Sequence, residues 1–211
     1  ANYSLRRDSH RRRDSLRPLR GLVFRLSSRQ KEILVVLALG FIAALLRLYQ
    51  LEQLPPGLHY DEAFKGVMAR QLIAGPDRPI FFTENLTEEP MMEYATALAF
   101  LVFGDTAWHI RLVAALAGII TVVALYFLAR QLFQQRWVAG LAAIVLAILY
   151  WHLNFSRLGM EPILTPLTMT LAFVFLWRGL FSTTGKPRWW SLALAGFFLA
   201  STQYTYKAAL F

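Results

Sequence analysis

Long apolar runs separated by short polar segments dominate the chain. Five of them reach or approach the length of a helix that crosses the hydrocarbon core of a bilayer, which is roughly 17 to 20 residues. They are residues 33–49, 108–128, 137–153, 162–177 and 189–206. The pattern predicts an all-α integral membrane protein with about five transmembrane helices.

The only large loop between these runs covers residues 51–107, and its pattern predicts two short helices. The first begins at Asp61 and ends before Gly75-Pro76, a stop signal. Its apolar face carries Phe64, Val67, Met68 and Leu72. The second begins near Thr87 and ends at Gly104. Its apolar part is too short to span, so we expect it to lie along the membrane surface.

Charge distribution predicts the orientation. Ten of the 22 Lys and Arg residues precede Ile33, and five more fall in the two loops on the same side. Nine of the 13 acidic residues lie between Glu52 and Asp105. Because basic loops remain in the cytoplasm, we expect a multi-pass protein of the plasma membrane with a cytoplasmic N-terminus and residues 51–107 outside. Arg47 and Arg111 lie within or at the ends of spans, where a long side chain can snorkel to the headgroups, so they need not be functional.

Composition limits the remaining classes. Hydrophobic residues make up 56% of the chain and cysteine is absent, which excludes disulfides and thiolate sites. We divide the chain into a basic cytoplasmic arm with an interfacial helix, residues 1–31, and a transmembrane domain, residues 32–211. The arm lacks a stacking pattern, so we expect no nucleic-acid partner. The first apolar run, which has no cleavage site after it, is expected to remain as a signal anchor.

Adjacent carboxylates at Asp61 and Glu62 are the main candidates for chemistry. At a helix N-terminus, free amides and the helix dipole favour an anion, so Asp61 is suited to accept a proton or hold a cation. Two other polar clusters, Arg157 with Glu161 and residues 204–207, are predicted on the same side. Carboxylates beside cations suit a reaction in which a hydroxyl attacks and a lipid phosphate leaves. The alternatives are an ordinary helix cap and ordinary polar residues at span ends.

The order of these motifs resembles the protein O-mannosyltransferase and aminoarabinose transferase families, membrane glycosyltransferases of the GT-C class. A basic N-terminus and one span precede the Asp-Glu pair. Segments 103–112, 128–130, 155–157 and 204–206 then come in order, so the resemblance covers roughly residues 33–211. It implies a partial GT-C fold, because members of these families continue through several more spans. Residues 1–211 would then be too short to act alone.

The resemblance also implies site residues and substrates. The donor would be a polyprenyl-phosphate sugar, a lipid-linked substrate, and the acceptor a hydroxyl of a protein or lipid on the outer face. Asp61 would be the base, supported by Glu62. Arg111, Arg157 and Lys207 would hold the donor phosphate, and Glu161 and His59 are candidates for a metal or the acceptor. No cofactor is firmly implied, since Glu161 is a single carboxylate where related enzymes place a metal-binding acidic motif.

Other interpretations of the sequence remain open. The chain could be a non-catalytic subunit of a larger bacterial inner-membrane assembly, such as an energy-converting complex, held with other membrane proteins partly through its basic arm. His109 and His152, near the outer ends of neighbouring spans, could ligate a haem or pigment. A zinc site at His59 and Asp61 would lack further ligands at a defined spacing.

Overall fold

The computed structural model describes residues 27–82, 89–181 and 186–207, which form helices and no β-strand. The chain divides into two units, Ala1–Leu34 and Val35–Phe211. Of the first unit, only the start of helix α2 (Ser28–Leu48) belongs to the described residues. Most of the arm and its interfacial helix lie outside them. Every described helix after α2 belongs to the second unit.

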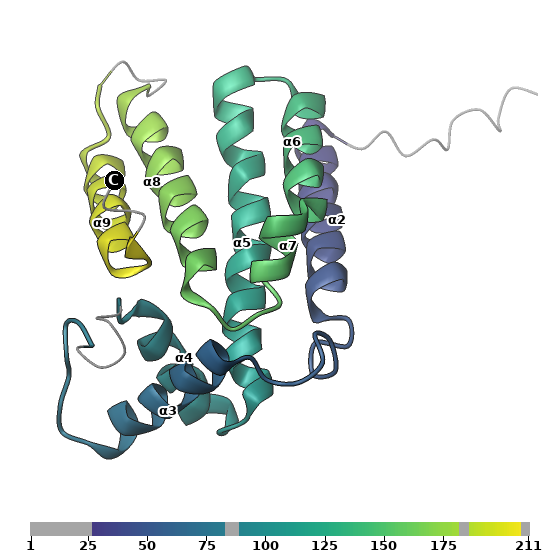
Figure 1. The fold of residues 1–211 in the computed structure, drawn as a ribbon. Coiled ribbons are helices and arrows are strands. Elements are labelled where there is room, and N and C mark those ends of the chain that lie inside the picture. Colours follow the sequence, from purple (N-terminus) through teal and green to yellow (C-terminus); the bar gives the residue numbers. More distant parts are fainter. Residues whose placement is uncertain (1–26, 83–88, 182–185, 208–211) are drawn as a thin grey trace, which may run out of the picture. The chain divides into compact units, whose positions relative to one another are not determined.

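Helices α5 (Ala107–Phe133), α6 (Arg136–Ile148), α8 (Leu164–Leu180) and α9 (Trp189–Ser201) run beside one another (Figure 1). Helix α5 packs on both α6 and α8, and α8 packs on α9. Helices α3 (Tyr60–Ala74) and α4 (Met91–Phe103) pack together at the end where α5 begins. The remaining elements are short: α7 (Tyr150–Phe155), η2 (Glu161–Ile163) and η3 (Thr202–Tyr204).

Small residues allow the long helices to approach closely. Ala139, Ala143 and Ala147 recur every four residues of α6, and all three are buried in one apolar cluster with Val122 and Tyr126 of α5. Without large side chains between them, two helices gain dispersion contacts along their backbones. On α8, a Cβ on Gly179 would lie 2.5 Å from the Leu192 side chain, so only glycine permits this contact with α9.

Among the described residues, two helices are long and apolar enough to cross a membrane, Ala107–Phe133 and Glu161–Leu180, the second including η2. Met91–Phe103 and Arg136–Ile148 are apolar but shorter. The predicted span 137–153 is interrupted at Leu149, where the backbone leaves the helical region between α6 and α7. The predicted span 189–206 is likewise divided into α9 and η3. The prediction of five spans is therefore only partly matched by continuous helices.

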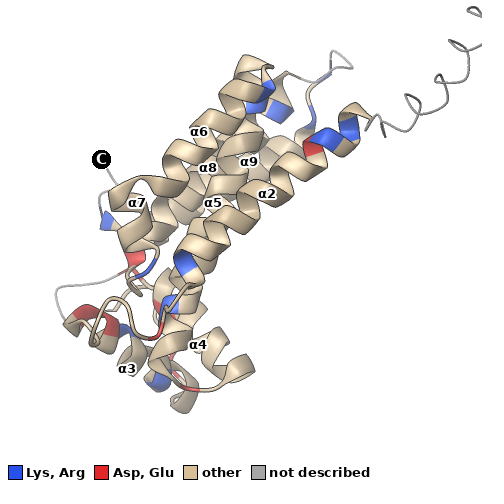
Figure 2. Cartoon of the chain, turned by 90° about the vertical axis from the view of Figure 1, so that its right-hand side faces the viewer, with Lys and Arg blue, Asp and Glu red and all other residues tan. Residues whose placement is uncertain are grey.

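The two loop helices form where the sequence predicts them, with shifted bounds. Helix α3 begins at Tyr60, with His59 as its N-cap. Helix α4 begins at Met91, directly after Pro90, and Thr87 lies outside the described residues. Figure 2 shows acidic residues gathered around α3, while α5, α6 and α8 carry few charges along their lengths. The end of this unit at which the acidic residues gather therefore contains the candidate site.

Candidate functional site

The start of α3 places its two carboxylates in different surroundings. The Asp61 side chain is 49% exposed, and its Oδ2 lies 3.5 Å from His59 Nδ1. Glu62 is fully buried and accepts the His59 backbone N–H at 2.9 Å. In return, His59 Nδ1 accepts the Asp61 backbone N–H at 3.2 Å, so the two side chains cap the helix reciprocally. Asp61 is thus the carboxylate of the pair that is open to solvent.

Glu62 forms a two-point ion pair with Arg111 of α5. Arg111 Nε donates to Oε1 at 2.9 Å, and Nη2 donates to Oε2 at 3.1 Å. The Gly159 backbone N–H also donates to Oε1, at 2.9 Å. Burial raises the pKa of Glu62, but these hydrogen bonds and the charge of Arg111 outweigh it, so the pKa lies below its ordinary value of 4.5. Glu62 therefore holds α3, α5 and the segment before η2 together as a carboxylate.

Arg111 does not snorkel, since only 3% of its surface is exposed. Its remaining N–H groups donate to backbone carbonyls of the loop between α2 and α3: Leu51 at 3.2 Å, Pro55 at 3.0 Å, and Gly57. The guanidinium is thus enclosed by one carboxylate and three carbonyls. A donor phosphate would have to displace some of these groups, and this predicted role of Arg111 stays a prediction.

Arg157, the second predicted phosphate contact, also binds backbone carbonyls. Its Nη1 donates to Leu46 and Arg47 at 2.8 and 3.0 Å, and its Nη2 donates to Tyr49 and Leu54 at 2.8 and 3.0 Å. Three of these carbonyls belong to the last turn of α2 or come shortly after it, where a helix has unpaired acceptors and a negative dipole end. Arg157 therefore caps α2 and fixes the adjoining loop.

A second buried charge cluster joins α3, α4 and η2. Lys65 Nζ lies 2.9 Å from Glu93 Oε1 and 3.3 Å from Glu161 Oε2. The Lys65 and Glu93 side chains are buried, at 1% and 0% exposed, and Glu161 is 19% exposed. Sequence reasoning overlooked Lys65 and Glu93 as site residues. The available signals were a lysine one turn after Asp61 and a lone glutamate in an otherwise apolar helix.

Glu161 is thus brought next to an ammonium group, while His59 remains beside Asp61. Within the described ranges, no group of three or more His, Asp or Glu side chains gathers in a metal-binding arrangement. Lys207, the third predicted phosphate contact, comes after η3 and is exposed. The nearby Thr205 hydroxyl pairs with Thr165 of α8 at 2.8 Å, which fixes this end of the chain against α8.

Arg47, for which snorkelling was one interpretation, is completely buried. Its Nη1 donates to the Ala43 carbonyl at 3.2 Å, and its Nη2 lies 2.9 Å from His152 Nδ1. Gly118 of α5 makes room for it, since a Cβ there would lie 2.8 Å from Arg47 Nε. A cation at one ring nitrogen of His152 does not favour a haem ligand, and His109 stacks on Phe103 with ring centroids 5.8 Å apart.

The described residues thus form a helical unit with two apolar helices of membrane-spanning length, and its buried ion pairs gather at one end. The family model for dolichyl-phosphate-mannose-protein mannosyltransferase matches residues 79–211. The chain belongs to this family of membrane-embedded glycosyltransferases of the GT-C type. None of the curated proteins and none of the solved structures compared with it matches. The matched residues contain Arg111, Arg157, Glu161 and Lys207, whereas Asp61 and the rest of α3 precede them.

Proposed function

We propose that this chain is the N-terminal part of a glycosyltransferase that moves a sugar from a polyprenyl phosphate to an acceptor hydroxyl. The transfer takes place on the outer face of the plasma membrane. The family match supports the class of reaction. The observation that carries the site assignment is the exposed Asp61 carboxylate, held in place by the buried contacts of its neighbour Glu62. No finding favours the alternative of a non-catalytic subunit.

The proposed reaction is a single displacement at the anomeric carbon. The acceptor hydroxyl gives its proton to the Asp61 carboxylate as its oxygen forms a bond to that carbon. The bond between the carbon and the phosphate oxygen breaks, and polyprenyl phosphate leaves with the bonding electrons. A cation lowers the barrier by countering the charge that develops on the phosphate. Of the three predicted phosphate contacts, Lys207 is exposed, Arg157 is partly buried and Arg111 is buried.

Asp61→Asn in the full-length protein tests the proposed base. The amide keeps the shape of the side chain but accepts protons poorly, so transfer from polyprenyl-phosphate mannose in membranes should fall by about 10²- to 10⁴-fold. Glu52→Gln is the matched control, because Glu52 is an exposed carboxylate in the same loop and has no assigned role. Undiminished transfer by Asp61→Asn would remove Asp61 from the mechanism.

We further propose that α2, α5, α6 with α7, α8, and α9 with η3 each cross the membrane, with the N-terminus in the cytoplasm. The excess of basic residues on that side supports this orientation. The sequence contains no cysteine, so single cysteines can report it. A membrane-impermeant maleimide should label Gln53→Cys in intact cells and Gln135→Cys only after permeabilisation. The opposite result would invert the topology.

A further inference from the structure

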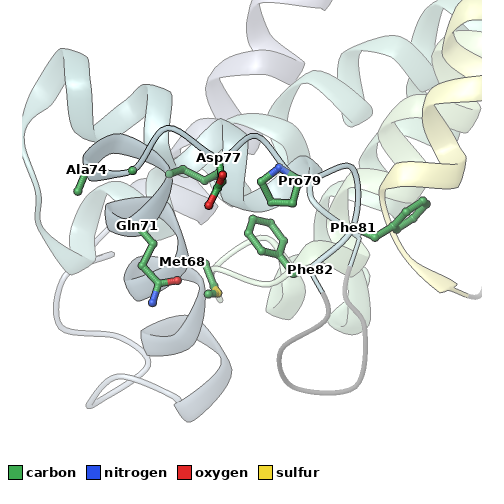
Figure 3. A pocket seen from close by; sticks show the side chains of 9 residues that line it. Met68, Gln71, Ala74, Asp77, Pro79, Phe81 and Phe82 are labelled. Carbon is green, nitrogen blue, oxygen red and sulfur yellow. The ribbon is translucent and has the colours of Figure 1, made fainter.

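A pocket of about 640 Å³ lies between the second half of α3 and the segment directly after it. Figure 3 shows Met68 and Gln71 projecting from α3, and the rings of Pro79 and Phe82 in the adjoining segment. The lining residues come only from this stretch of chain: Met68, Gln71, Leu72, Ala74, Gly75, Asp77, Pro79, Phe81 and Phe82. Neither the proposed chemistry nor the buried ion pairs use this pocket.

The wall opposite α3 is attached to the rest of the unit at several points. The Tyr94 hydroxyl of α4 donates to the Pro79 carbonyl at 3.1 Å. The Phe81 ring stacks on Tyr204 of η3, with centroids 5.6 Å apart, and Phe82 is buried in the apolar core. These contacts involve three different residues of the segment, so its backbone is held in place before any ligand arrives. A preformed wall reduces the ordering cost of binding.

Arg78 stiffens the turn that closes the pocket. Its Nη1 donates to the carbonyls of Gly75 at 2.8 Å and Asp77 at 2.7 Å. The guanidinium is therefore occupied by the turn itself, and Arg78 does not line the pocket. The pocket wall carries no Lys or Arg side chain and has one carboxylate, that of Asp77. The lining therefore offers no cation to a phosphate, so the pocket is unsuited to the donor's charged group.

The lining combines two kinds of contact. The Asp77 carboxylate and Gln71 amide are exposed, and no hydrogen bond or ion pair to either side chain is recorded in the described part of the chain. Together they offer three acceptor oxygens and one amide donor group, which suits hydroxyls. The Phe81 ring, which is 43% exposed, and Pro79 offer apolar surfaces, and the negative face of an aromatic ring attracts polarised C–H groups. A neutral sugar presents both hydroxyls and C–H faces.

We propose that this pocket binds the acceptor, and that the acceptor is a neutral carbohydrate. This assignment rests on the proposed function, because it is Asp61 that makes α3 the acceptor side of the site. Met68 comes seven residues after Asp61, which is two helical turns on the same face and about 10 Å along the axis. The acceptor lies along α3, with its reacting hydroxyl at Asp61 and its remaining sugar units in the pocket.

Saturation-transfer NMR on the full-length protein in lipid nanodiscs tests this binding directly. The probes are mannotriose and maltotriose, with inorganic phosphate as a third probe. At least one trisaccharide should receive saturation, and phosphate should not compete with it. Gln71→Ala and Asp77→Ala should each weaken binding by about five- to tenfold, the effect of losing a hydrogen bond to a sugar. Ile80→Ala is the matched control, since Ile80 is exposed in the same segment but does not line the pocket.

Binding of neither trisaccharide, equal binding by all variants, or displacement by phosphate would overturn the carbohydrate pocket. Asp61→Asn separates this result from that of the proposed function, because it should keep trisaccharide binding while losing transfer. If transfer is lost in Asp61→Asn and no trisaccharide binds, the base stands and the pocket assignment fails. If trisaccharides bind at the pocket but Asp61→Asn transfers normally, the pocket stands as a carbohydrate site and the base fails.

Discussion

Asp61 and Glu62 are adjacent in the sequence but lie in opposite environments: the Asp61 side chain is 49% exposed, whereas that of Glu62 is fully buried against Arg111. One carboxylate is available to a substrate and the other fixes the helix that carries it. In a helix, neighbouring residues point about 100° apart, so a pair at the start of α3 can serve both purposes. Under the proposed function, Glu62 is a positioning residue for Asp61.

Glu62→Gln should destabilise the protein strongly. It removes the charge that compensates Arg111, and breaking a buried ion pair from one side costs about 3–5 kcal/mol. The double variant Glu62→Leu/Arg111→Met should lose less stability than the single variants Glu62→Leu and Arg111→Met lose when their effects are added. The reason is that no buried charge remains unpaired in the double variant. Thermal unfolding in detergent measures this. Strictly additive losses would mean that the pair contributes no coupling energy.

Acid should weaken the fold through Glu62. Its pKa is lower in the folded protein than its ordinary value of 4.5, so the folded state binds fewer protons than the unfolded state in the acidic range. The stabilisation that the Glu62 carboxylate contributes is complete above about pH 5. It is lost as the pH falls through the pKa that Glu62 has in the folded protein. Unfolding temperatures from pH 7 to pH 3 should fall less steeply for Glu62→Gln than for the wild type. Parallel curves would show that other carboxylates cause the acid loss.

Lys65→Met should destabilise the junction of α3, α4 and η2. It leaves Glu93 and Glu161 next to one another without the cation between them, at a cost of about 3–5 kcal/mol. Arg70→Gln is the matched control on the same helix, because Arg70 pairs with Asp105 at the surface, where water screens the pair. We expect no measurable change in unfolding temperature for that control. Equal effects of the two variants would contradict a special role of the buried cluster.

Gly118→Ala should lower stability by about 1–3 kcal/mol, the usual cost of overpacking. A Cβ there would lie 2.5 Å from the Ser156 Cβ and 2.8 Å from Arg47 Nε. Gly140→Ala in α6 is the control, since a Cβ at that position meets nothing within 4 Å. The control should be neutral or stabilising, by up to about 1 kcal/mol. A neutral Gly118→Ala would show that α5 and α7 can separate freely.

Helix positions were predictable from the sequence because they depend on local periodicity. The stop at Gly75 and the apolar face of α3 placed that helix within a residue of its observed start. The break at Leu149 was not predictable, since residues 137–151 lack charged residues and contain no glycine or proline after Gly140. An apolar composition indicates that a segment can lie in a membrane. It does not show where the helix is interrupted within that segment.

The partners of the candidate site residues were not predictable from the sequence, and the roles assigned to those residues stay predictions. Asp61, Glu62, Arg111 and Arg157 were identified, yet the contacts of both arginines with loop carbonyls involve separations of more than 50 residues. In the sequence, Arg47 is an arginine at the end of an apolar run, a pattern that a snorkelling residue also has. Its burial depends on the absence of a side chain at Gly118. Such contacts arise from packing between helices, which local pattern does not encode.

Arg157 binds the last turn of α2 and the loop after it through carbonyl oxygens, which every amino acid provides. These four bonds therefore do not depend on which side chains stand at the accepting positions. Replacements at Tyr49 or Leu54 preserve all four bonds if the backbone keeps its course, whereas one replacement at Arg157 removes them together. Tolerance to mutation in this region should consequently be highly uneven, with many permissive positions in the loop and one intolerant position more than 100 residues away.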